Sequence, residues 1–99
     1  MNKFETVEMA SGGLALVLEP SAEWSDFSKH STSWAQKLKA KVLKNAVISI
    51  DECLQEVEIE GRKFWITYDD FQSSIQLEPS EKSFNGIILA IQKILKSSS

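Results

Sequence analysis

The side chains that could do chemistry in this chain are few and lie far apart. The sequence of 99 residues contains one histidine, His30, and one cysteine, Cys53. A thiolate and an imidazole can act together as nucleophile and base, and a metal site needs several His, Cys or carboxylate ligands at suitable spacing. Nothing in the spacing requires His30 and Cys53 to meet, and strand alternation around Cys53 indicates a small buried side chain. The sequence therefore predicts no metal site and no cofactor.

A second candidate for chemistry is the segment that contains Tyr68, Asp69 and Asp70. Paired carboxylates can carry acid–base or metal chemistry when burial separates their pKa values. Aspartates in loops also form turns, because their side chains accept hydrogen bonds from nearby backbone amides. Both interpretations stay open: an enzyme or small-ligand binder with its site here is one alternative, and a simple turn is the other. Phe71, directly after the pair, is expected to be buried and to anchor the loop.

The clearest structural pattern lies in residues 57–66, which alternate as two antiparallel strands do. A two-residue turn at Gly61 and Arg62, with glycine first, suits a type II′ hairpin because glycine accepts a positive φ without steric cost. This turn would place Ile59 opposite Phe64 on a purely apolar face. The sequence therefore predicts a hairpin whose apolar face belongs to the core.

The other face of this hairpin is the candidate binding surface. It carries Trp65 among acidic side chains, with Glu58 as the expected cross-strand neighbour of the indole. Tryptophan gives a large contact area and is enriched in interface hot spots. We therefore predict a non-catalytic protein-binding module whose site residues are Trp65, Glu56, Glu58 and Gln76. Two alternatives stay open: a homodimer through the same face, and a Trp65 ring that is merely covered by a loop or by its own glutamate neighbours.

The remaining pattern predicts the elements that must position these residues. Apolar runs around Ser11-Gly12-Gly13 indicate a first hairpin, and apolar spacing of 3.6 residues indicates one helix over residues 24–42 and another over residues 80–96. A short strand over residues 46–50, the 57–66 hairpin and a strand over residues 74–78 lie between the helices. The expected fold is α+β in the order ββαβ(β)βα: one domain over residues 1–99, a two-layer sandwich with a mostly antiparallel sheet of about four to five strands and both helices on one face.

The same periodicities predict which side chains are buried. The expected core comprises Phe27, Trp34, Leu38, Ile59, Phe64, Ile66, Phe84, Ile88 and Ile91. Trp24 and Ile94 also fall on the apolar stripes of the two predicted helices. Truncating Ile66 or Ile88 is expected to destabilise the fold strongly.

Composition and charge exclude several classes of function. The net charge is −3 and the isoelectric point is about 5.1, which disfavours nucleic-acid binding. No apolar run reaches the ~20 residues that span a bilayer, the first residues lack the apolar segment of a signal peptide, and one cysteine fits a reducing compartment. We therefore expect a cytoplasmic protein without a membrane partner. Lysines from Lys37 to Lys44 are expected on one helix edge and glutamates follow in the next strand; both are either solvated or bind a charged partner.

One stretch carries a resemblance. The run Trp65-Ile66-Thr67-Tyr68-Asp69-Asp70-Phe71, followed by Ile75-Gln76-Leu77-Glu78-Pro79, and Trp34-Ala35 in the first helix, resemble short bacterial proteins of an uncharacterised domain-of-unknown-function family. The resemblance implies a bacterial source and brings no activity with it. In size and class the chain is also similar to bacterial immunity proteins and secretion chaperones, although the usual helix-first order of the chaperones differs from the strand-first order here.

Overall fold

The computed structural model describes residues 4–49 and 53–98 of the chain. In chain order its elements are β1 Thr6–Glu8, β2 Leu14–Glu19, the short 3-10 turn η1 Trp24–Asp26, α1 Phe27–Lys37, β3 Lys41–Val42, β4 Val47–Ile48, β5 Cys53–Ile59, β6 Arg62–Asp69, β7 Ser74–Pro79, η2 Lys82–Phe84 and α2 Asn85–Ser98. Asp51 and Glu52, which belong to the acidic run of the sequence, lie outside the described residues.

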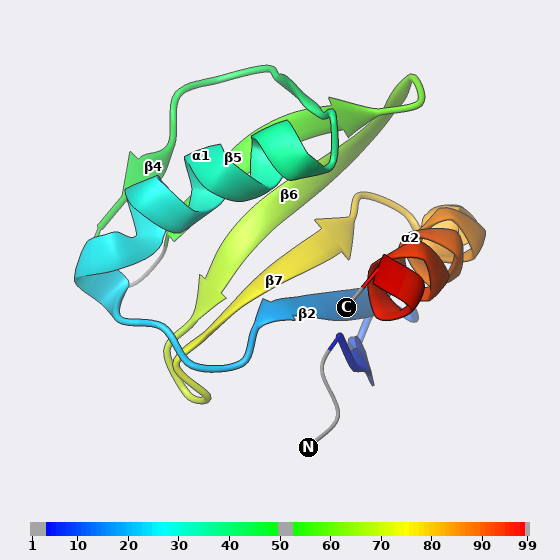
Figure 1. The fold of residues 1–99 in the computed structure, drawn as a ribbon, viewed down its shortest axis with the longest axis horizontal. Coiled ribbons are helices and arrows are strands. Elements are labelled where there is room, and N and C mark those ends of the chain that lie inside the picture. Colours follow the sequence, from blue (N-terminus) through cyan, green and yellow to red (C-terminus); the bar gives the residue numbers. More distant parts are fainter. Residues whose placement is uncertain (1–3, 50–52, 99) are drawn as a thin grey trace.

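The strands form one antiparallel sheet in the order β1-β2-β7-β6-β5-β3, and β4 also pairs with β5. Both helices cover the same face of this sheet (Figure 1). The α+β class and the antiparallel sheet are as predicted, but the sheet has seven strands within the described residues. β4 falls within the strand predicted over residues 46–50. The two-residue β3 was not predicted: it lies inside the expected 24–42 helix and is too short to show a period of two.

The core lies between the sheet and the two helices. Phe27 and Trp34 from α1 and Ile88 from α2 belong to the same hydrophobic cluster as Ile66 and Leu77 of the central strands. Of the predicted core, six side chains are buried: Phe27, Trp34, Ile59, Phe64, Ile66 and Ile88. Leu38, Phe84 and Ile91 are half-buried at the margin of the cluster. Two expectations were wrong, because Trp24 is 43% exposed and Ile94 is 63% exposed.

The turn of the β5–β6 hairpin differs from the predicted one. Its two central residues are Glu60 and Gly61, with φ angles of 53° and 78°, and Ile59 pairs with Arg62. A positive φ at both central residues is the requirement of a type I′ turn, whose twist matches that of the flanking strands. The prediction of type II′ failed because it assumed that only the glycine would take a positive φ.

The corrected turn shifts the register by two residues. Val57 faces Phe64, and Glu56 rather than Glu58 faces Trp65. Because side chains alternate with a period of two, a shift of two residues changes the cross-strand neighbours but keeps every side chain on its predicted face. Trp65 therefore lies on the face without helices, as expected, although its predicted neighbour was wrong.

This turn makes a testable prediction. Replacing Glu60 by asparagine is expected to raise the free energy of unfolding by about 0.5–1 kcal/mol, because Asn-Gly is the preferred pair of a type I′ turn. Replacing Gly61 by alanine is expected to lower it by about 1 kcal/mol, since a Cβ at φ 78° is strained even though space around Gly61 is open. Urea unfolding of both variants checks this, and an unchanged midpoint for both would contradict the type I′ assignment.

The first helix is shorter than the predicted 24–42 helix. It ends at Lys37, where the amide of Lys39 donates to the carbonyl of Gln36 and the amide of Ala40 donates to the carbonyl of Ala35. This is a Schellman C-cap with Lys39 in the left-handed region, at φ 56°. Because the cap uses lysine where glycine is usual, the sequence carried no stop signal. The predicted lysine edge is consequently split, with Lys37 on α1, Lys41 in β3 and Lys44 in the segment that follows β3.

Candidate functional site

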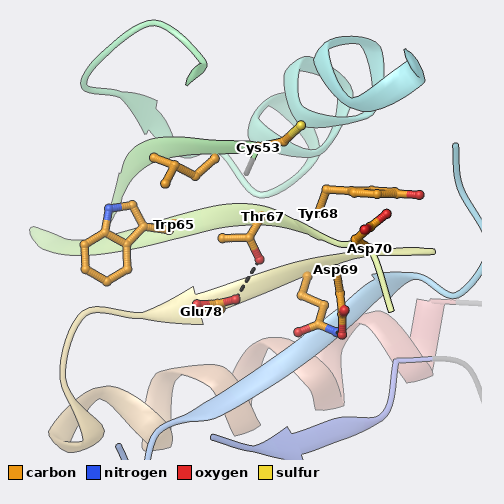
Figure 2. Close-up of a pocket in the computed structure, with 9 residues that line it drawn as sticks. Cys53, Trp65, Thr67, Tyr68, Asp69, Asp70 and Glu78 are labelled. Carbon is orange, nitrogen blue, oxygen red and sulfur yellow. Dashed lines mark hydrogen bonds between the residues drawn. The ribbon is translucent and has the colours of Figure 1, made fainter. Parts of the chain in front are cut away.

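A groove of about 720 Å³ lies along β6 and is open to solvent. We call it the Trp65 groove; it is lined by Cys53, Leu54, Trp65, Thr67, Tyr68, Asp69, Asp70, Gln76 and Glu78. Figure 2 shows Trp65 at one end and Tyr68, Asp69 and Asp70 at the other, with Thr67 and Glu78 between them. The groove therefore joins two sets of residues that the sequence analysis treated as rival sites.

Trp65 is held by its strand neighbours. Its cross-strand partners are Glu56 on β5 and Glu78 on β7, and the ammonium of Lys63 lies 5.9 Å from the ring centroid. At this distance a cation–π attraction is worth about 0.5–1 kcal/mol at an exposed site. The indole is half-buried, so it is neither core nor freely mobile. Leu54, diagonal to Trp65 on the same face, adds apolar surface to this end of the groove.

The floor of the groove is polar and ordered by hydrogen bonds. Gln76 is 6% exposed, and its Nε2 donates to Ser74 Oγ at 3.1 Å and to Asp69 Oδ2 at 3.3 Å. Thr67 Oγ1 donates to Glu78 Oε2 at 2.7 Å (Figure 2). Since these side chains hold one another in place, they need not reorganise when a ligand approaches.

At the far end of the groove, Asp69 stabilises the turn that follows β6. The amide of Phe71 donates to Asp69 Oδ1 at 2.9 Å, and Asp69 Oδ2 accepts from Gln76, so both oxygens of Asp69 are engaged. The hydroxyl of Tyr68 donates to the carbonyl of Ala22 at 3.3 Å. This geometry supports the turn interpretation over the catalytic alternative. Phe71 was expected to be a buried anchor, and that was wrong: its side chain is fully exposed, at 101%.

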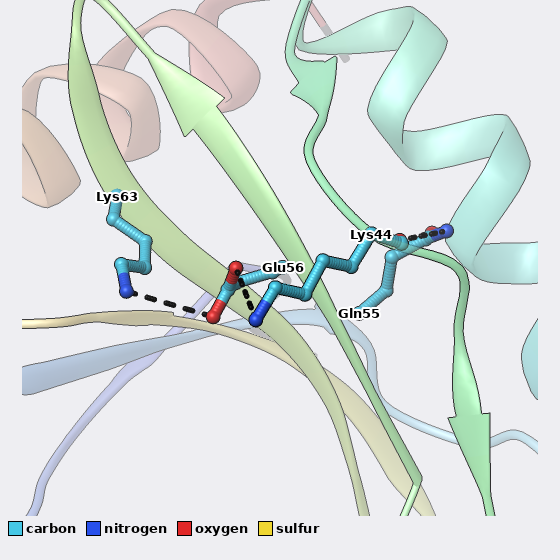
Figure 3. A network of polar contacts seen from close by, with 4 residues as sticks. All are labelled: Lys44, Gln55, Glu56 and Lys63. Carbon is cyan, nitrogen blue, oxygen red and sulfur yellow. Dashed lines mark hydrogen bonds and ion pairs between the residues drawn. The ribbon is translucent and has the colours of Figure 1, made fainter.

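Two predicted site residues lie outside the groove. Glu56 is within 3.9 Å of the ammonium of Lys44 and within 3.5 Å of that of Lys63 (Figure 3). Gln55 reaches the carbonyl of Lys44 from the helix-covered face at 3.5 Å. In the strand register, Glu58 lies opposite Lys63 of β6 on one side and opposite Lys41 of β3 on the other. The structure therefore brings Trp65 and Gln76 into the site, engages Glu56 in ion pairs with two lysines and places Glu58 opposite lysines in the strand register, outside the groove.

A second hollow of about 520 Å³ shares Tyr68 with the groove. We call it the Trp24 hollow; it is lined by Ser21, Ala22, Glu23, Trp24, Asp26, His30, Tyr68 and Ser73. The indole N–H of Trp24 donates to the carbonyl of Ser49 at 3.0 Å. Periodicity missed this hollow because it placed Trp24 on the buried stripe of a continuous helix, whereas Trp24 belongs to η1, ahead of α1.

Comparisons with known proteins add no constraint. No family model, curated protein or solved structure matches this chain. The resemblance of residues 65–71 to an uncharacterised bacterial family stays a prediction.

In residues 4–49 and 53–98, no group of three or more His, Cys, Asp or Glu side chains is placed to hold a metal ion. Within the same described ranges, no helix has the length and apolar character needed to cross a membrane.

Proposed function

We propose that this chain is a non-catalytic protein-binding module that uses the Trp65 groove. The observation that carries the proposal is the half-buried indole of Trp65 at one end of an open groove, on the sheet face without helices. A fixed aromatic ring offers a large contact area at low conformational entropy cost. The single cysteine supports a reducing compartment such as the cytoplasm for this interaction.

The shape of the groove favours a macromolecular partner over a small molecule. Its volume falls within the usual range of ligand pockets, roughly 300–1,000 Å³. Small-molecule sites, however, enclose most of the ligand and are lined mainly by apolar side chains. This groove lies on the open face of a sheet and is lined by three carboxylates, from Asp69, Asp70 and Glu78. A protein segment can bind such a surface because it gains contacts beyond the groove itself.

Site-directed photo-crosslinking tests the proposal in the cells that make the protein. A benzophenone amino acid replaces Asp70, which is exposed and lines the groove. The matched control carries the same group in place of Lys93, an exposed residue of α2. We expect a discrete protein adduct from the groove position alone, and we expect Trp65→Ala in the same chain to remove it.

The other outcomes discriminate between the alternatives. An adduct of twice the mass of the chain would identify the homodimer in place of a separate partner. Adducts of equal yield from both positions, or none from the groove, would contradict binding through this surface.

A further inference from the structure

The charged side chains that line the two hollows are carboxylates, whereas the ammonium of Lys63 lies beside the groove, over the Trp65 ring. The Trp65 groove is lined by Asp69, Asp70 and Glu78, and the Trp24 hollow by Glu23 and Asp26. Among the described residues that line either one, there is no lysine or arginine, and His30 is the sole titratable nitrogen. The described lysine ion pairs go to Glu56, outside both hollows. Three of these five carboxylates, from Glu23, Asp26 and Asp70, are exposed. Those of Asp69 and Glu78 are half-buried and accept hydrogen bonds from neighbouring groups. The two hollows meet at Tyr68, and we call their combined lining the acidic track.

Aromatic side chains lie along the same acidic track. Trp65 lies at the end of the groove away from Tyr68, which both hollows share, and Trp24 lies in the second hollow. Phe71 belongs to the turn that runs from Asp70, in the groove, to Ser73, in the Trp24 hollow. A fully exposed phenylalanine held by a backbone hydrogen bond to Asp69 adds an apolar contact at the junction.

We infer that the partner is a basic, extended segment of another protein, which runs along the Trp65 groove, past Tyr68 and Phe71, and into the Trp24 hollow. The inference rests on the proposed function and names the partner class for the same site. An extended chain presents alternate side chains to one surface, so lysine or arginine at alternate positions would face the carboxylates. Cationic side chains also bind over indole rings. The Lys63 ammonium already lies 5.9 Å from the Trp65 ring centroid, so Trp65 offers apolar contact, and the exposed Trp24 indole is the ring that a cation of the segment would approach.

Two acidic residues allow a clean test. Glu23 and Asp26 are exposed, three residues apart, and neither side chain caps the helical turn that follows it. Glu5 and Glu8 have the same spacing, are exposed and lie at the β1 edge, outside both hollows. The double variants E23K/D26K and E5K/E8K therefore change the net charge equally and differ only in where the charge changes.

The measurement is fluorescence anisotropy with a short fluorescein-labelled peptide in which lysine alternates with leucine and serine. A matched peptide has glutamine at every lysine position. We expect the lysine peptide to bind at least about tenfold more tightly, and E23K/D26K to weaken it about tenfold more than E5K/E8K does at low salt. This difference should nearly vanish near 1 M salt, where the Debye length is about 3 Å. Phe71→Ala, with no buried contact to lose, should weaken binding about threefold without shifting the melting temperature.

Each of the alternative binding results would contradict one part of the inference. Equal binding of the lysine and glutamine peptides would contradict a basic partner. Equal effects of E23K/D26K and E5K/E8K would mean that binding depends on net charge and not on the Trp24 hollow. Displacement of the peptide by spermidine at matched charge would show that the site selects amines rather than a protein segment. If Trp65→Ala abolishes binding while E23K/D26K behaves like its control, the proposed function stands and the path into the Trp24 hollow is wrong. If E23K/D26K weakens binding and Trp65→Ala does not, the proposed function fails instead.

Discussion

Replacing Ile88 by alanine is expected to lower the free energy of unfolding by about 2–5 kcal/mol. Ile88 is completely buried in the cluster that joins α2 to the sheet. Removing its outer atoms forfeits their transfer free energy and leaves a cavity, because close-packed neighbours relax only in part. For a chain of 99 residues this corresponds to a fall in melting temperature of roughly 4–8 °C per kcal/mol. Thermal and urea unfolding measure it directly.

The same helix supplies the control for this experiment. Ile94 lies six residues later in α2 and is 63% exposed. Ile94→Ala removes the same atoms but little buried area, and alanine has the higher helix propensity, so we expect a change within about 0.5 kcal/mol. Equal losses from Ile88→Ala and Ile94→Ala would mean that the packing of α2 on the sheet is wrongly described.

Trp65→Ala is expected to weaken binding of the partner, and of the basic peptide probe, by at least about 2 kcal/mol, or roughly thirtyfold. The indole is the largest side chain in the groove, and hot spots are enriched in tryptophan because a large flat ring excludes water from the contacts around it. The half-buried ring also supports its strand, so we expect a smaller loss of about 1 kcal/mol in unfolding free energy. Titration and urea unfolding of the same variant separate the two effects.

Val42→Ala is the control for the Trp65→Ala binding experiment, because it also removes exposed apolar surface from a strand. Val42 is 46% exposed on β3 and lies outside the groove. It should leave the dissociation constant within about twofold of the parent value. A Trp65→Ala variant that binds as tightly as Val42→Ala would remove the main support for the Trp65 groove as a binding surface.

Strand alternation was the most reliable guide in this chain. The faces of Phe64, Trp65 and Ile66 follow from a period of two, and a register error of two residues left these faces unchanged. Helix periodicity predicted the ends of the first helix less well than strand alternation predicted the strand faces. The 24–42 pattern kept its phase past Lys37 because a stripe of apolar residues does not encode where a helix stops, and the Schellman cap at Lys39 has no glycine to mark it.

The candidate site could be predicted only in part. Trp65 and Gln76 fell on the correct face by alternation alone. Glu56 and Glu58 were on that face too, but whether a carboxylate is available depends on its neighbours. Lys44, which pairs with Glu56, comes from the segment after β3, whose approach no local pattern describes. Lys63 belongs to the predicted hairpin but reaches Glu56 because the register differs by two residues from the predicted one.

By itself, the sequence determined the α+β class, six of the nine side chains of its expected core and the polarity of both faces of the β5–β6 hairpin, because these depend on local period and on apolar content. Tertiary structure alone decided that Trp65 and Asp69 share one groove, that Trp24 lies in a second hollow and that Phe71 is exposed. The reason is physical: a groove is made by side chains from several strands and turns, and its shape follows from how strands pair and where turns end. Those features depend on contacts between residues distant in sequence, which periodicity within one segment does not contain.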